Sequence, residues 1–175
     1  ADDARQFVSL GLDKAVRKIF PDLSLHQYER LLLGVQQALI TNHASVYLFP
    51  GAREVIEQLH RAGVSLAIAT NRGAAALERA LQAAKLETFF RVTRAASQVP
   101  AKPHPQMLEE ILDVFGCAPR DALMVGDSAA DMEMARALHV PSVGVDFYNQ
   151  HRSVLEEAGA GQVFNNFVEL AAYLE

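Results

Sequence analysis

The sequence predicts an α/β domain, a doubly wound parallel sheet with helices on both faces, preceded by a small helical cap. Short apolar runs such as VSLAIAT (64–70) and ALMVGD (122–127) alternate with amphipathic helical stretches from residue 52 onward. Strands separated by single helices need right-handed crossovers and are therefore parallel. Continuous apolar runs are typical of strands buried on both faces. Because no strand pattern precedes residue 64, residues 1–44 are expected to be helical throughout.

The composition of the chain argues against several classes of protein. The chain has 175 residues, half of them apolar, which suits one domain with a small appendage. Its net charge of −5 gives no bulk attraction for nucleic acid or for an anionic membrane. The only cysteine, Cys117, cannot form an internal disulfide, so a reducing, cytoplasmic setting is expected. No apolar run approaches the ~20 residues of a membrane helix. No pattern indicates the oligomeric state.

The first 46 residues are expected to form the cap. Two apolar stripes at helical spacing, separated by Pro21, predict two helices there. The first stripe comprises Leu12, Val16, Ile19 and Phe20, and the second comprises Tyr28, Leu31, Leu32, Val35 and Leu39. The turn LFPG (48–51) follows and separates the two kinds of pattern. We therefore expect a helical cap over 1–46 and an α/β core over 47–175.

The core alternates regularly along the chain. Gly63 and Gly116 end two of its helices. Helices are expected over 52–62, 73–85, 105–115, 129–138 and 152–158, with a closing helix after residue 165. Strands are expected over 64–70, 90–95, 122–127, 141–147 and 162–165. Ligands of such sheets bind beyond the carboxyl ends of the strands, so the residues that follow each strand are the candidate site.

Two of these strand ends carry groups suited to an anion. Thr70 and Asn71 precede a helix, where a hydroxyl, an amide and the first helical N–H groups can donate to phosphate. The alternative is that they only cap that helix. Lys102 is held just ahead of another helix by Pro103 and Pro105. A cation at that end of a helix favours an anionic partner, although an ordinary surface lysine is the alternative.

A third strand end carries carboxylates. Asp127 follows a buried strand and is a natural ligand for a hard cation such as Mg²⁺. Asp131 also fits a capping box with Ser128, which is a purely structural role. The six histidines lack ligand spacing. Neither a phosphate-binding P-loop, nor a G-x-G-x-x-G motif, nor a G-x-S-x-G elbow is present, so nucleotide binding and serine hydrolase chemistry have no support.

Thr70, Lys102, Asp127 and Asp131, in this order and each after a strand, resemble the motifs of the haloacid dehalogenase superfamily. The phosphoglycolate phosphatase-like branch is most similar across 48–146, and residues 11–16 with their neighbours resemble its cap. The resemblance implies hydrolysis of a small phosphorylated metabolite through an aspartyl-phosphate, with Mg²⁺ as cofactor. It further implies that Thr70, Asn71 and Lys102 hold the phosphoryl group. Asp127 would ligate the metal, and Asp131 would ligate it too or orient Lys102.

The sequence departs from that pattern at one place. The first motif of the family, Asp-x-Asp-Gly-Thr on a strand, supplies the nucleophile and the general acid/base, and no D-x-D occurs here. Asp2 and Asp3 precede a helix and lack the following Gly-Thr. In the family that strand is central, between the strands that end at Thr70 and Asp127. We therefore expect a gap in the sheet, a chain that is an incomplete or truncated phosphatase, and no activity from these residues alone.

Other readings stay open. The chain could be a non-catalytic phosphate- or Mg²⁺-binding remnant, or a phosphomutase on the same scaffold. The dehalogenase branch is disfavoured because it needs no metal carboxylates, and a response-regulator receiver is disfavoured because it carries no helical cap. Substrate choice is expected to reside in the cap, where Lys14 and Arg17 are the cations that could meet a second anionic group or remain solvated. Tyr148 and Asn149 follow the strand over 141–147 and are placed at the entrance.

Overall fold

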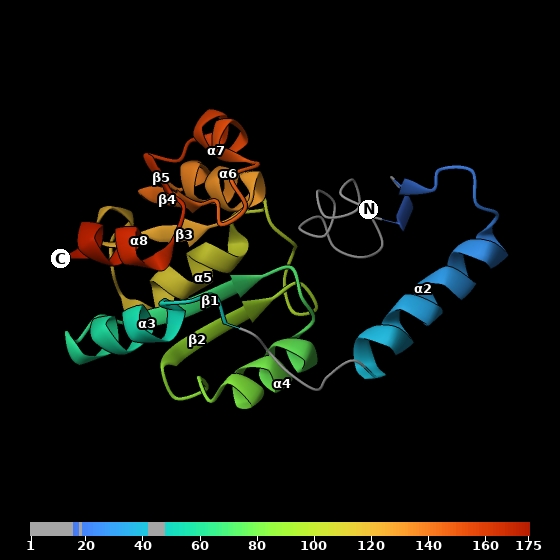
Figure 1. Cartoon of the computed structure of the whole chain (residues 1–175), viewed down its shortest axis with the longest axis horizontal. Helices are drawn as coiled ribbons and strands as arrows, with labels where there is room; N and C mark the ends of the chain where they lie inside the picture. Colours follow the sequence, from blue (N-terminus) through green and yellow to red (C-terminus); the bar gives the residue numbers. More distant parts are fainter. Residues whose placement is uncertain (1–15, 18, 42–47) are drawn as a thin grey trace. The chain divides into compact units, whose positions relative to one another are not determined.

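The computed structural model describes residues 16–17, 19–41 and 48–175, with residues 35–41 described by their backbone alone (Figure 1). The chain divides into two compact units, Ala1–Tyr47 and Leu48–Glu175. This division falls one residue beyond the cap boundary expected from the LFPG turn. Leu12 and Lys14 lie outside the described residues, so the roles predicted for them stay predictions.

The first unit contains helix α2, Leu25–Thr41. Ser24 precedes it and donates its hydroxyl to Gln27 Oε1 at 2.8 Å. Val16 and Tyr28 are buried, which agrees with the expected apolar stripes, whereas Phe20 is exposed. The guanidinium of Arg17 lies 4.1 Å from the centre of the Tyr28 ring. The aliphatic and aromatic surface of this short helical unit is thus partly covered by a stacked arginine.

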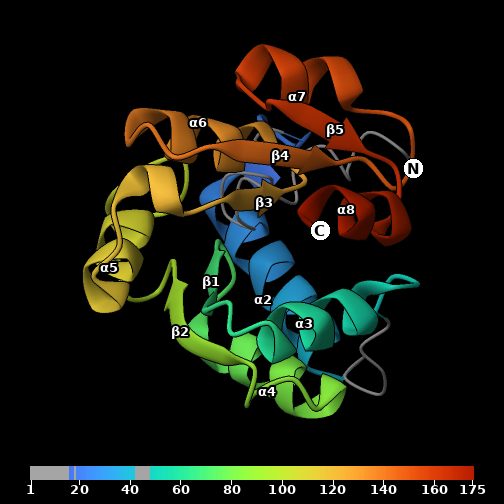
Figure 2. The ribbon, with the colours of Figure 1, turned by 90° about the vertical axis from the view of Figure 1, so that its left-hand side faces the viewer.

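The strands of the second unit form two parallel sheets (Figure 2). Strand β1 (Leu66–Thr70) pairs with β2 (Phe90–Ala95). Strand β4 (Ser142–Val145) lies between β3 (Met124–Gly126) and β5 (Gln162–Phe164). The parallel pairing expected from the strand–helix alternation is therefore confirmed. Among the described residues, no hydrogen-bonded strand connects β1 to β3.

Helices surround both sheets. They are α3 (Ala52–Arg61), α4 (Ala74–Ala84), α5 (Gln106–Phe115), α6 (Ala129–Ala137), α7 (Arg152–Ala158) and α8 (Phe167–Leu174), with a 3₁₀ turn at Pro119–Asp121. Helices α4 and α5 pack on β2, α6 packs on β3 and β4, and α8 packs on β5 and α3. No helix in the described ranges is long and apolar enough to cross a membrane.

The two sheets share one layer of core. Met107 and Leu108 of α5 pack with Met134 and Ala135 of α6, and Ala69 of β1 and Met124 of β3 lie against them. This cluster therefore holds the helices of both sheets together. Two further clusters, around Leu155 and around Phe164, bury the remaining faces of the three-stranded sheet. The hydrophobic effect fixes the relation of β1 to β3 even though the two strands are not paired.

The burial predicted for two strands was wrong. All five residues of β1 are half-buried. Val125 in the middle of β3 is 37% exposed. Only β4 is buried along its whole length. The difference follows from strand position, because β4 has a neighbour on each side while β1 and β3 have one each. The apolar runs correctly indicated strands but not the open edges.

Candidate active site

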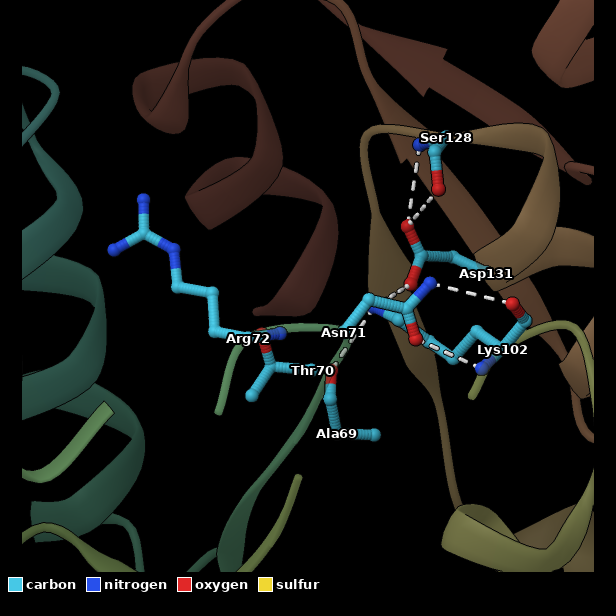
Figure 3. Close-up of polar contacts among 7 residues, drawn as sticks. All are labelled: Ala69, Thr70, Asn71, Arg72, Lys102, Ser128 and Asp131. Carbon is cyan, nitrogen blue, oxygen red and sulfur yellow. Dashed lines mark hydrogen bonds and ion pairs between the residues drawn. The ribbon is translucent and has the colours of Figure 1, made fainter. Parts of the chain in front are cut away.

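The residues predicted from the strand ends gather at the carboxyl edge of the two sheets. Thr70 ends β1, Lys102 lies between β2 and α5, and Asp131 lies in the first turn of α6 after β3. Figure 3 shows the side chain of Asp131 between Ser128 and Lys102, with Asn71 beside Lys102. Residues from three separate loops therefore meet although the sheets are not hydrogen-bonded to each other.

Lys102 is the centre of this cluster. Its ammonium group donates to the carbonyl oxygen of Ala69 at 3.0 Å and to Asp131 Oδ1 at 2.6 Å. The lysine side chain is only 12% exposed. An ammonium group has three donors, so one remains uncommitted among the described residues. The lysine thus joins β1 to the loop after β3 and retains capacity for an anion.

Asp131 is almost fully enclosed. It is 2% exposed, and its second oxygen, Oδ2, accepts from the Ser128 backbone N–H at 3.2 Å and from the Ser128 hydroxyl at 2.7 Å. The predicted capping box is therefore present. Both oxygens already have donors, Lys102 on one and Ser128 on the other. Of the two roles that the resemblance implies for Asp131, this geometry favours orienting Lys102.

Thr70 faces the same edge with its hydroxyl partly committed. Its Oγ1 accepts the backbone N–H of Arg72 at 3.1 Å. Since one lone pair is used in this way, the hydroxyl proton is available for donation to a ligand. Thr70 and Lys102 together offer two donors to an anion beyond the end of β1.

Asn71 plays a different part from the expected one. Its Oδ1 accepts the backbone N–H of Lys102 at 2.8 Å, and its Nδ2 donates to the Lys102 carbonyl at 3.2 Å. The amide therefore clamps the backbone that carries the lysine, in a two-way bridge between the loops after β1 and β2. Its predicted contact with phosphate stays a prediction, while its role in positioning Lys102 rests on these bonds.

Replacing Asn71 by Ala should loosen Lys102. We expect a fall in Tm of roughly 2–6 °C, because two partly buried hydrogen bonds are lost, and about tenfold weaker binding of inorganic phosphate. Thermal unfolding and calorimetric titration would measure the two effects. Gln98→Ala is the matched control, since Gln98 also accepts a backbone N–H at a strand end, that of Ala95. Equal loss of phosphate affinity in both variants would contradict the clamp.

Asp127 is the free carboxylate of the cluster. Its side chain reaches solvent, yet burial by the surrounding protein raises the pKa of Asp127, the charge of Asp131 raises it further, and Lys102 opposes both. The two carboxylates of Asp127 and Asp131 thus carry more negative charge than Lys102 alone neutralises. A hard cation would neutralise it, and Mg²⁺ is commonly held by one or two carboxylates together with water and substrate phosphate. Asp127 therefore fits a metal ligand, although the described residues contain no cluster of three such groups.

Asp127→Asn should stabilise the metal-free protein and remove its response to Mg²⁺. A folded-state pKa above the unfolded value means that the folded protein binds more protons, so Asp127 lowers stability above that pKa. We expect the variant to have a Tm higher by roughly 1–3 °C in chelator at pH 7, the charge being partly solvated. The difference should shrink as the pH falls and wild-type Asp127 becomes protonated. A variant less stable than wild type in chelator would contradict the assignment.

Sequence reasoning missed Asp146, which follows β4 as Asp127 follows β3. It is 4% exposed and accepts the backbone N–H groups of Gln150 at 3.0 Å and His151 at 3.0 Å. Burial raises the pKa of Asp146, but these bonds outweigh that effect and hold it below its usual value. The carboxylate fixes the loop before α7. The sequence analysis placed Asp146 inside a strand over 141–147, whereas β4 ends at Val145.

The remaining predicted residues belong to other parts of the chain. Arg17 stacks on Tyr28 in the first unit, and its proposed role toward substrate stays a prediction. Tyr148 is 60% exposed after β4, and its ring meets Phe49 edge-on at 5.9 Å. Phe49 in turn stacks on Phe147 at 4.0 Å. Asn149 follows with a positive φ of 53°. The loop after β4 thus carries an exposed aromatic group beside the linker at 48–51.

Comparisons with known proteins show the family of the chain. The sequence profile of the haloacid dehalogenase-like hydrolases matches residues 1–145. The chain belongs to this family. It is 30% identical to phosphoglycolate phosphatase 1 of Pseudomonas aeruginosa over 165 residues, which cover 90% of this chain and 61% of that protein. It is 31% identical to a phosphoglycolate phosphatase of Haemophilus influenzae over 128 residues, 73% of this chain and 57% of that protein. The chain thus spans less than two thirds of either.

Two solved structures superpose on this haloacid dehalogenase-like chain and have the same fold. A predicted phosphoglycolate phosphatase from Haemophilus somnus 129PT superposes with a TM-score of 0.82 at 21% identity, covering 100% of this chain and 83% of that one. A hydrolase from Pseudomonas syringae superposes with a TM-score of 0.84 at 24% identity, covering 99% and 82%. At these identities the likeness shows the fold. The α/β architecture and the family inferred from the four strand-end residues are therefore confirmed.

Proposed function

We propose that this haloacid dehalogenase-like chain is the phosphate- and metal-binding part of a Mg²⁺-dependent phosphatase that hydrolyses a small phosphomonoester of the phosphoglycolate type. The observation that carries the proposal is the ammonium group of Lys102, fixed by Ala69 and Asp131 with one donor uncommitted among the described residues. This donor lies at the carboxyl end of β1, next to the carbonyl of Ala69, the residue that precedes Thr70.

The residues of this chain would act mainly by electrostatics. The Thr70 hydroxyl and the Lys102 ammonium would donate to the oxygens of the transferring phosphoryl group. Since both are held before the ligand arrives, little reorganisation is needed as negative charge develops. Asp131 and Ser128 would keep Lys102 in position, and Asn71 would fix its backbone. Asp127 would hold Mg²⁺, which when bound would neutralise charge on the phosphoryl oxygens.

The nucleophile is proposed to come from a segment outside these 175 residues. The family forms an aspartyl-phosphate, and no residue among those described stands in for its Asp-x-Asp pair. Two observations support entry between β1 and β3. These strands are not paired with each other, and Val125 on β3 is exposed. An additional parallel strand there would satisfy open backbone groups on both sides.

The test is release of inorganic phosphate from phosphoglycolate by the protein carrying any residues that naturally precede Ala1. We expect hydrolysis with Mg²⁺, none in chelator, and none from Asp127→Asn. Titration with inorganic phosphate and Mg²⁺ accompanies the assay. Binding of both without turnover in that protein would instead support the non-catalytic remnant. Turnover that persists in chelator would refute the metal assignment.

A further inference from the structure

Arg72 carries a positive charge at the candidate site that the proposed chemistry does not use. It lies two residues beyond Thr70, at the carboxyl end of β1, and its side chain is exposed. Its guanidinium forms no ion pair or hydrogen bond with any described residue, unlike the guanidinium groups of Arg53, Arg94 and Arg152, each of which meets a glutamate. Figure 3 shows the side chain directed away from Lys102 and Asp131.

The backbone of Arg72 is fixed even though its side chain is not. Its N–H donates to Thr70 Oγ1 at 3.1 Å, and its carbonyl accepts the backbone N–H of Ala96 at 3.3 Å. The Ala96 N–H also reaches the Thr70 carbonyl at 3.0 Å. The same bonds that set the Thr70 hydroxyl therefore set the starting point of the arginine. An anion on Thr70 would therefore lie close to the fixed backbone of Arg72, from which the guanidinium can reach outward.

Lys102 and Arg72 offer positive charge at two separate positions where an anion could bind. Lys102 is enclosed and tied to Asp131, and its remaining donor suits one compact anion. Arg72 diverges from it and presents a planar fork of donors, which matches a carboxylate or a phosphate in a bidentate manner. A ligand that fills both positions must carry two anionic groups. A phosphomonoester with a neutral tail would leave the guanidinium solvated.

We propose that Arg72 binds a second anionic group of the substrate, a carboxylate or a further phosphate, and so selects phosphomonoesters that carry one. This inference rests on the proposed function and names the substrate class of the same site. The second group bears no bond that breaks, so Arg72 is a specificity-determining residue. Its contribution is one charge-assisted contact at the edge of the site.

The test compares matched ligands in the protein with any residues that naturally precede Ala1. Calorimetric titration with phosphonoacetate and with methylphosphonate, in the presence of Mg²⁺, measures binding with and without the carboxylate. Wild type should prefer phosphonoacetate. Arg72→Gln should weaken phosphonoacetate by about tenfold or more and methylphosphonate by less than about twofold. Arg72→Lys should restore part of the preference. Arg79→Gln, the same charge change at an exposed position of α4, should leave both affinities unchanged.

Hydrolysis of phosphoglycolate and of ethyl phosphate gives the second readout, as kcat/KM. A selective fall for phosphoglycolate in Arg72→Gln supports the inference. An equal fall for both esters, or no fall for either, overturns it while leaving the proposed phosphatase intact. If neither phosphonate binds and neither ester is hydrolysed, the proposed function fails and the inference fails with it. Selective phosphonate binding without hydrolysis would support Arg72 and refute the phosphatase.

Discussion

In the phosphatase proposed above, carrying any residues that naturally precede Ala1, Lys102→Met should remove activity and destabilise the fold together. The substitution leaves Asp131 as a buried carboxylate at 2% exposure without its cation. Breaking a buried pair by removing one partner costs about 3–5 kcal/mol. Loss of the donor to a developing phosphoryl charge should lower kcat by about 10²–10³-fold. Chemical denaturation and steady-state kinetics would measure the two losses. Lys85→Met, at the exposed carboxyl end of α4, is the control for charge and should change neither.

A second variant separates the two losses. Lys102→Met combined with Asp131→Asn removes the uncompensated charge, and the neutral amide can still accept from Ser128. The double variant should recover most of the stability and none of the activity. This non-additivity is expected of residues in direct contact. If stability were not recovered, the lysine would stabilise the fold by packing of its methylene groups, and the electrostatic account of the pair would be wrong.

Gly126→Ala should displace Asp131 and so disrupt the same site. A Cβ at Gly126 would stand 2.6 Å from Asp131 Cγ and 2.8 Å from Oδ2, and closer still to its Cβ. Asp131 cannot give way without leaving Lys102 or Ser128. Overpacking costs about 1–3 kcal/mol and occasionally more, so we expect a fall in Tm of roughly 3–10 °C, together with loss of phosphate binding. Thermal unfolding and phosphate titration would measure these changes.

Gly73→Ala is the matched control for backbone flexibility and size. Gly73 lies in the loop after β1, and an added Cβ would meet nothing within 4 Å. Its φ of −71° and ψ of 148° are open to alanine. Its effect on stability should stay under about 1 kcal/mol, since only the helix N-cap is altered. Similar losses in the two variants would mean that contact with Asp131 is not the cause.

Most of the fold could be predicted because its signals are local. Strand β2 and helix α7 have the bounds expected from the sequence, and helices α3 to α6 differ from theirs by one residue at one or both ends. The four strand-end residues were found because parallel strands bring their carboxyl ends to one edge. Pairing is not local, however. The half-buried state of β1 and the exposure of Val125 depend on which strands become neighbours, and an apolar run does not record that.

The partners of individual side chains could be predicted only in part. The Ser128–Asp131 capping box is visible as a spacing of three residues, and the structure has it. The clamp of Asn71 on Lys102 joins residues 31 apart in sequence, so no spacing rule indicates it. Asp146 was overlooked because the N–H groups that it accepts belong to the backbone, which carries no sequence signal. The expected strand over 141–147 also contained Asp146, so neither its position after β4 nor its role was predicted.

The two bonds of Lys102 also bear on how the protein responds to its ligand. The ammonium group contacts the carbonyl oxygen of Ala69 in β1 and the carboxylate of Asp131, which follows β3. It therefore links the two sheets as well as offering a donor to a ligand. An anion that accepts the remaining donor would share the positive charge of this group with both contacts. Ligand binding and the strength of these two hydrogen bonds between the sheets are therefore thermodynamically linked. The relaxation of amide signals in β1 and in the first turn of α6 would then report on the same binding event.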